Sequence, residues 1–107
     1  MASPVLTSLE SAALERLLAG ESSTLSALRM QISNLRVRAR HFTGRGFFIE
    51  FECSSDENNA ATNKDRMYIS GIDAEVEGVE DGVGFVLFIE NGYIELLEAF
   101  SYGGPWD

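Results

Sequence analysis

The chain holds one imidazole and one thiol, at His41 and Cys53, and a thiol beside an imidazole can act as a nucleophile. Both residues fall in a predicted β-hairpin, whose expected register places His41 opposite Ile49 and leaves Cys53 four residues further along. At ~3.3 Å per residue, this corresponds to a separation of roughly 13 Å. We therefore expect no Cys–His dyad, with Cys53 in the core and His41 at a strand end.

Carboxylates recur at close intervals in the second half of the chain. Such groups can serve as acid and base or bind hard metal ions, but alternating acids on a strand typically mark a solvent-facing side. A small-ligand or enzymatic site that uses Glu95, Glu98 and Tyr102 near the C-terminal tail is the alternative left open. The acidic positions are Asp73, Glu75, Glu77, Glu90, Glu95 and Glu98.

The sequence contains none of three common motifs for metal binding or nucleophilic catalysis. There are no Cys/His pairs at zinc spacing, no calcium-binding loop and no Gly-x-Ser-x-Gly nucleophile elbow. The sequence therefore predicts no catalytic residue, no cofactor and no metal, and it favours a protein that is not an enzyme.

Arg36, Arg38 and Arg40 alternate with apolar residues, and such a row near Phe42 is one way to bind a nucleic-acid strand. The predicted register places Arg40 opposite Glu50 and Arg38 opposite Glu52, on one face of the sheet. We therefore expect cross-strand ion pairs here, and no nucleic-acid partner.

The turn of this hairpin decides that register. A three-residue loop, 44–46, closed by Thr43 and Phe47, suits a bulged turn with Gly46 at positive φ, and it places Phe42 opposite Phe48. A two-residue loop would instead place Arg40 opposite Ile49. The charge pattern favours the bulged turn.

Two helices are expected before this hairpin. Thr7-x-x-Glu10 is a capping-box pattern ahead of an apolar stripe, and it predicts a helix from about Ser8 to Ala19. A Ser or Thr within 22–24 can cap a second helix, which should end near Ser33-Asn34.

A second hairpin organises the rest of the chain. Asn91-Gly92 separates two apolar runs, which is a strong signal for a two-residue turn with both residues at positive φ. Because no other segment is apolar on both faces, this hairpin should lie centrally in the sheet. The expected pairs are Ile89 with Ile94, Leu87 with Leu96, and Val86 with Leu97.

Residues 54–65 read as a polar loop, and residues 66–76 as a third strand with a bulge near Ser70-Gly71. The chain 1–107 is therefore predicted to form a single α+β domain. Its two N-terminal helices pack on one face of a five-stranded antiparallel sheet. A meander is the simplest strand order, and a curled sheet whose last strand returns towards the first is the rival.

The net charge of −9 is unevenly distributed, with +5 over residues 22–49 and −12 over residues 50–107. An acidic chain repels nucleic acid and anionic lipid, whereas its acidic half can attract a basic protein. A lone Cys53, no apolar run long enough to cross a membrane and no signal-peptide pattern predict a soluble cytoplasmic protein without a membrane partner.

Three motifs resemble those of a family of small, uncharacterised bacterial proteins of about 100 residues. They are Thr-Gly-x-Gly-Phe-Phe from Thr43, Gly-Phe-Val-Leu-Phe from Gly84, and Leu-Glu-x-Phe-x-Tyr-Gly from Leu97, followed by Trp106. The similarity covers most of the chain, although this chain has Pro105 before the Trp where the family tends to close with Trp-Pro. The resemblance implies a shared fold and supplies no catalytic residue.

We therefore expect a non-enzymatic protein-interaction module that binds a partner protein or a second copy of itself, and its sharper form is an immunity- or inhibitor-type role. The expected surface lies on the sheet face away from the helices, unless the C-terminal tail folds over it. The helices should cover Phe85, Leu87, Ile89, Ile94 and Leu96. The candidate interaction residues are Phe42, Phe48, Val86, Phe88, Tyr93, Leu97, Tyr102 and Trp106.

Overall fold

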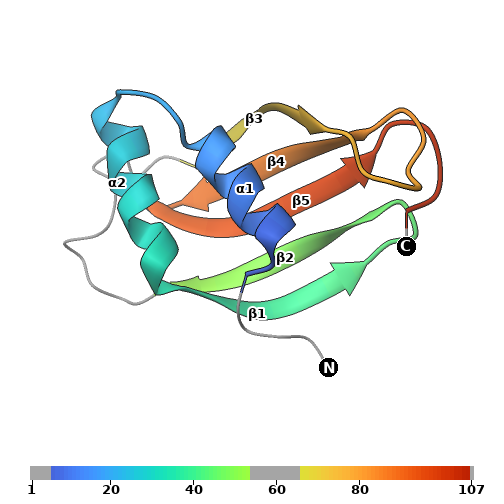
Figure 1. The fold of residues 1–107 in the computed structure, drawn as a ribbon. Coiled ribbons are helices and arrows are strands. Elements are labelled where there is room, and N and C mark those ends of the chain that lie inside the picture. Colours follow the sequence, from blue (N-terminus) through green and yellow to red (C-terminus); the bar gives the residue numbers. More distant parts are fainter. Residues whose placement is uncertain (1–5, 54–65, 107) are drawn as a thin grey trace.

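The computed structural model describes residues 6–53 and 66–106. Two helices lie on one face of a five-stranded antiparallel sheet, so the predicted α+β class is confirmed (Figure 1). The loop predicted over 54–65 lies outside the described residues. Among the described helices, none has the length and apolar character needed to cross a membrane.

Both helices begin where their capping residues predict. Helix α1 spans Ser8–Leu17, and Thr7 and Glu10 form the reciprocal hydrogen bonds of a capping box. Helix α2 spans Ser23–Gln31, with the Ser22 hydroxyl accepting from the Leu25 N–H, and a short 3₁₀ turn, η1 (Ile32–Asn34), follows it. Helix α1 contacts β3 and β4, whereas α2 contacts β5.

The five strands are β1 (Leu35–Phe42), β2 (Gly46–Cys53), β3 (Met67–Ala74), β4 (Val83–Glu90) and β5 (Tyr93–Ser101). Their spatial order is β1-β2-β5-β4-β3, so β5 lies between β2 and β4 and the sheet is not a strict meander. The physical reason is that β5 is apolar on both faces. A meander would leave it at an edge, and the observed order pairs it on both sides.

Each hairpin contains a β-bulge that the predicted registers lacked. In the first, the loop has two residues, Gly44-Arg45, and Thr43 closes it by donating its N–H to the Gly46 carbonyl, so that Arg40 pairs with Ile49. The register shifts again between Val37 and Ala39. The expected three-residue loop and the expected pairs of Arg40 with Glu50, Arg38 with Glu52 and Phe42 with Phe48 are therefore wrong. The observed partners of His41 and Phe42 are Phe48 and Phe47.

In the second hairpin, Asn91 and Gly92 both have positive φ and Ile89 pairs with Ile94, as predicted. The register then shifts, so that Phe88 pairs with Leu96 and Leu87 pairs with Leu97. The two leucines consequently exchange faces. Leu97 is fully buried under the helices, whereas Leu96 is half-buried on the opposite face.

The core fills the space between the helices and the sheet. Its fully buried side chains include Leu14, Leu18, Leu28, Ile49 and Phe85. The other helix-facing residues of the central hairpin, Leu87, Ile89 and Ile94, are buried with them, as expected.

Two polar links join the helices to the sheet. The Arg40 guanidinium binds the Glu10 carboxylate through both nitrogens, at 2.8 and 3.1 Å, and the two side chains are only 8% and 3% exposed. The Gln31 side chain bridges the Gly92 carbonyl and the Ile94 N–H. Arg40 thus faces the helices, which corrects the predicted row of arginines on the opposite side.

Candidate functional site

The sheet face opposite the helices, here the open face, is covered by no described element (Figure 1). Its aromatic and aliphatic side chains are only partly shielded, and Tyr68 is 69% exposed. These side chains come from β2, β3, β4 and β5, which the strand order brings side by side. They are Phe48, Tyr68, Val86, Phe88, Leu96 and Phe100.

A groove runs across the middle of this face, where β2, β5, β4 and β3 lie next to one another. Its apolar wall is Phe48, Tyr68, Phe88 and Leu96, and its polar rim is Arg66, Glu95 and Glu98. Met67 also lines it, although this residue packs against the core. We call these eight residues the groove. It combines an apolar wall with carboxylates at its rim, which is the composition of a binding surface.

The charges at the groove are unequally compensated. Arg66 forms an ion pair with Glu90 at 3.0 Å, which lowers the pKa of Glu90. Some desolvation and the neighbouring Glu90 carboxylate raise the pKa of Glu95, although its side chain is exposed. Within the described part of the chain, Glu95 and Glu98 form no ion pair. The rim therefore carries surplus negative charge.

A second polar group lies beside the groove, on β1 and β2. The His41 ring stacks on Phe48 with the ring centroids 4.5 Å apart, and its Nε2 is 2.8 Å from Glu50 Oε2. Arg38 also contacts Glu50, at 3.2 Å. The hydrogen bond from His41 and the nearby Arg38 lower the pKa of Glu50. The expected nearness of Arg38 to an acid is present, although Glu50 replaces Glu52.

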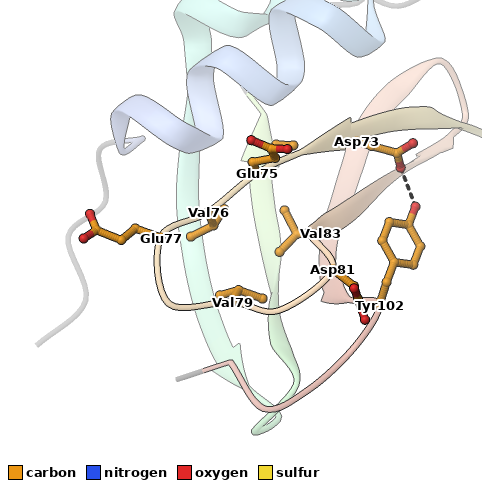
Figure 2. Close-up of a pocket in the computed structure, with 10 residues that line it drawn as sticks. Asp73, Glu75, Val76, Glu77, Val79, Asp81, Val83 and Tyr102 are labelled. Carbon is orange, nitrogen blue, oxygen red and sulfur yellow. Dashed lines mark hydrogen bonds between the residues drawn. The ribbon is translucent and has the colours of Figure 1, made fainter.

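An acidic pocket lies at the other end of the sheet, between β3, the loop to β4 and Tyr102 (Figure 2). Asp73, Glu75, Glu77 and Asp81 surround a floor of valines. The Tyr102 hydroxyl donates to Asp73 Oδ1, and this bond and the carboxylate charge raise the pKa of Tyr102. Among the described residues, no three acidic, His or Cys side chains form a metal-binding group.

The structure brings together only part of the predicted interaction surface. Phe48, Val86, Phe88, Tyr93 and Tyr102 occur on the open face or at its ends, but Leu97 is buried in the core. Leu97 is therefore excluded, because the bulge in β5 turns it towards the helices.

The C-terminal tail does not cover the groove. The Trp106 N–H donates to the Gly44 carbonyl, and the Trp106 ring lies 5.3 Å from that of Phe47, on the helix side of the sheet. The Phe42 ring lies 6.2 Å from that of Phe47, and Phe42 is 72% exposed. Phe42 and Trp106 thus form a separate aromatic cluster with Phe47, away from Phe88.

The alternative ligand site is also divided. Glu95 and Glu98 line the groove, whereas Tyr102 lines the acidic pocket. His41 and Cys53 stay apart as predicted, since Cys53 pairs with Leu35 at the opposite end of β1.

Sequence reasoning missed four groove residues, namely Arg66, Met67, Tyr68 and Leu96. The alternation of Tyr68 with Met67 and Ile69 was a usable signal, because it places Tyr68 on the face opposite the core. For Leu96 the signal was hidden by the bulge, since strict alternation assigns it to the helix side.

No protein-family model matches this chain, and neither the curated proteins nor the solved structures contain a match to it. The resemblance to small bacterial proteins stays a prediction. Function must therefore be inferred from the surface itself.

Proposed function

We propose that this protein is a non-enzymatic interaction module that binds a positively charged partner protein through its open face. The observation that carries the proposal is the groove, an aromatic surface that no described element covers. Monomeric proteins rarely leave contiguous apolar surface exposed unless it binds something. Aromatic residues at the centre and a charged rim are also the usual composition of a protein interface.

Charge selects the kind of partner. The chain carries a net charge of −9, and the groove rim has the same sign, because Glu95 and Glu98 form no ion pair within the described part of the chain. A second copy would bring like charges together, so a basic partner protein fits better than a homodimer. An immunity- or inhibitor-type role follows where that partner is a basic toxin or enzyme. A bacterial cytoplasmic location belongs to this proposal, since a lone Cys53 suits a reducing compartment.

The test is a capture experiment with surface variants. Phe88→Glu and Leu96→Glu place a charge in the groove, whereas Phe42→Glu places one on an exposed aromatic residue outside the open face. We expect wild type and Phe42→Glu to capture the same basic protein from the native host, and both groove variants to lose it. Calorimetry with the purified partner should reproduce that order. Equal capture by all four proteins would contradict the proposal.

A further inference from the structure

We propose that the groove holds a lysine or arginine side chain of the partner, with its aliphatic stem along the apolar wall and its charged end at Glu95 and Glu98. This inference rests on the proposed function, because it specifies the chemistry of the segment that docks there. It concerns one site within the open face and predicts which side chain the partner presents.

The bulge in β5 creates the required juxtaposition. Ile94 pairs with Ile89 and Leu96 pairs with Phe88, so Glu95 is the extra residue of its strand. Glu95 and Leu96, although adjacent in sequence, both line the groove. Regular alternation from Ile94 places Glu95 on the open face and Leu96 on the helix side, and the inserted residue turns Leu96 to the open face as well. A carboxylate therefore stands directly beside the apolar wall.

The carboxylates at this position can accept another cation. Among the described residues that line the groove, Arg66 is the one basic residue, and it already forms its ion pair with Glu90. Glu95, although exposed, lies near that same Glu90 carboxylate, which together with some desolvation disfavours its charged form. A positive charge from a partner would relieve this repulsion. Glu98, on the same face, provides a second acceptor.

The apolar wall selects a cation on a long stem. Lysine and arginine bury their methylene groups on apolar surface while the charged end stays at a polar rim. The rings of Phe48, Tyr68 and Phe88 add a favourable surface for a cation. An acidic or purely apolar segment would satisfy only one of these two features. A second copy of this chain would present the same acidic rim.

The probe is a random peptide library displayed on phage and selected on the wild-type protein. Enriched peptides should carry a lysine or arginine flanked by apolar residues. The tightest peptide is then synthesised twice, once as selected and once with the basic residue replaced by norleucine, and its affinity is measured by fluorescence anisotropy.

The protein variants separate charge at the groove from charge elsewhere. Glu95→Gln/Glu98→Gln should weaken the selected peptide about ten-fold or more, because its basic residue then loses both charged acceptors. The control Glu75→Gln/Glu77→Gln makes the same charge change at the acidic pocket and should alter affinity less than about two-fold.

Arg66→Ala provides a test of the opposite sign. Removing this cation frees Glu90 and deepens the negative potential at Glu95, so the basic peptide should bind more tightly. Damage to the fold would weaken binding instead, which makes a gain in affinity diagnostic of the charge at the rim.

The outcomes distinguish a failure of the cation site from a failure of the proposed function. Enriched peptides that lack a basic residue, or that bind Glu95→Gln/Glu98→Gln as well as wild type, would overturn the cation site. If those peptides still lose affinity for Phe88→Glu, the open face remains the docking surface. Peptides indifferent to Phe88→Glu, or no enrichment at all, would contradict the proposed function as well.

Discussion

Arg40 shows how a single residue joins two layers of this protein. Its guanidinium binds Glu10 through two nitrogens, and both side chains are almost completely shielded from water. The same Glu10 accepts the Thr7 N–H in the capping box. One carboxylate therefore caps the N-terminus of α1 and anchors that helix to β1.

We expect Arg40→Ala to destabilise the fold by about 3–5 kcal/mol, because it leaves the Glu10 carboxylate buried without its cation. Arg38→Ala is the matched control. Its side chain is 61% exposed and contacts an acid at the surface, so its removal should hardly move the urea midpoint. Denaturation curves of the two variants that overlap would contradict a structural role for the buried pair.

Two glutamates should respond to pH in opposite senses. The pKa of Glu50 is lowered by its hydrogen bond to His41 and by Arg38, so its stabilising effect is present above the unfolded pKa and is lost as pH falls through the folded value. The pKa of Glu95 is raised by some desolvation and by Glu90, so its ionised form opposes folding above the folded pKa, and this penalty fades as the pH falls from the folded to the unfolded value.

At pH 7 we therefore expect Glu50→Gln to lower the melting temperature and Glu95→Gln to raise it or leave it unchanged. The Glu95→Gln difference should disappear as the pH falls to about 4.3, the ordinary pKa of glutamate, whereas the Glu50→Gln difference should be lost only below that pH. Melting curves across this range check the prediction. A lower melting temperature for both variants at neutral pH would show that Glu95 stabilises the fold.

At the scale of elements, Gly46 permits β2 to pair with β5. It has φ of 151°, and a Cβ there would lie 2.0 Å from the Ala99 carbonyl oxygen. Gly44, in the same turn, also has positive φ, but a Cβ there meets nothing within 4 Å. Substitution of Gly44 therefore introduces backbone strain alone, whereas substitution of Gly46 adds a steric clash with β5.

Gly46→Ala should therefore destabilise the protein far more than Gly44→Ala. Backbone strain alone costs about 1–3 kcal/mol, whereas overpacking adds a further 1–3 kcal/mol or more. Circular dichroism and urea unfolding of both variants give the comparison. Equal losses would mean that β5 moves away from Gly46 at little cost.

Short-range signals predicted most of the elements, because a cap or a turn depends on a few neighbouring residues. The capping box at Thr7, the cap at Ser22, the turn at Asn91-Gly92 and the bulge near Gly71 are all confirmed. The register of the second hairpin failed because one inserted residue changes the face of all that follow, and the apolar run of β5 shows no phase slip like the one near Gly71. The register of the first hairpin failed at its turn, where the charge pattern favoured three loop residues and the structure has two.

The same limitation applied to the candidate site. Phe48 and Phe88 were assigned to the open face correctly, because the inserted residues of the two hairpins lie in β1 and β5, whereas Phe48 is in β2 and Phe88 is in β4. Leu96 and Leu97 follow the bulge in β5 and were therefore interchanged. Tyr68 lies at the groove because β3 pairs with β4, a pairing that the predicted meander also contains, so its alternation with Met67 and Ile69 was enough to place it there.

At the scale of the molecule, charge argues against self-association. The net charge is −9, and residues 50–107 contribute −12 while residues 22–49 contribute +5. Two open faces brought together would oppose the glutamates of the two grooves. The same negative potential speeds the approach of a basic protein.

We expect sedimentation to show a monomer for wild type and for Phe88→Glu at low ionic strength, where repulsion is least screened. Phe42→Glu serves as the control outside the open face. A wild-type dimer that Phe88→Glu dissociates and Phe42→Glu does not would assign the groove to a second copy of the chain.

The central position of β5 has a consequence for how the nascent chain acquires its structure. The ribosome makes β5 after the other four strands, yet β2 and β4 both pair with it, and Gly46 meets Phe100 across 54 positions of sequence. Until β5 emerges, the β1–β2 hairpin and the β3–β4 pair are two fragments, each with an unsatisfied inner edge. Such edges recruit other strands, including the β5 of a neighbouring chain. Chaperone protection would therefore matter most during the synthesis of the last quarter of this sequence.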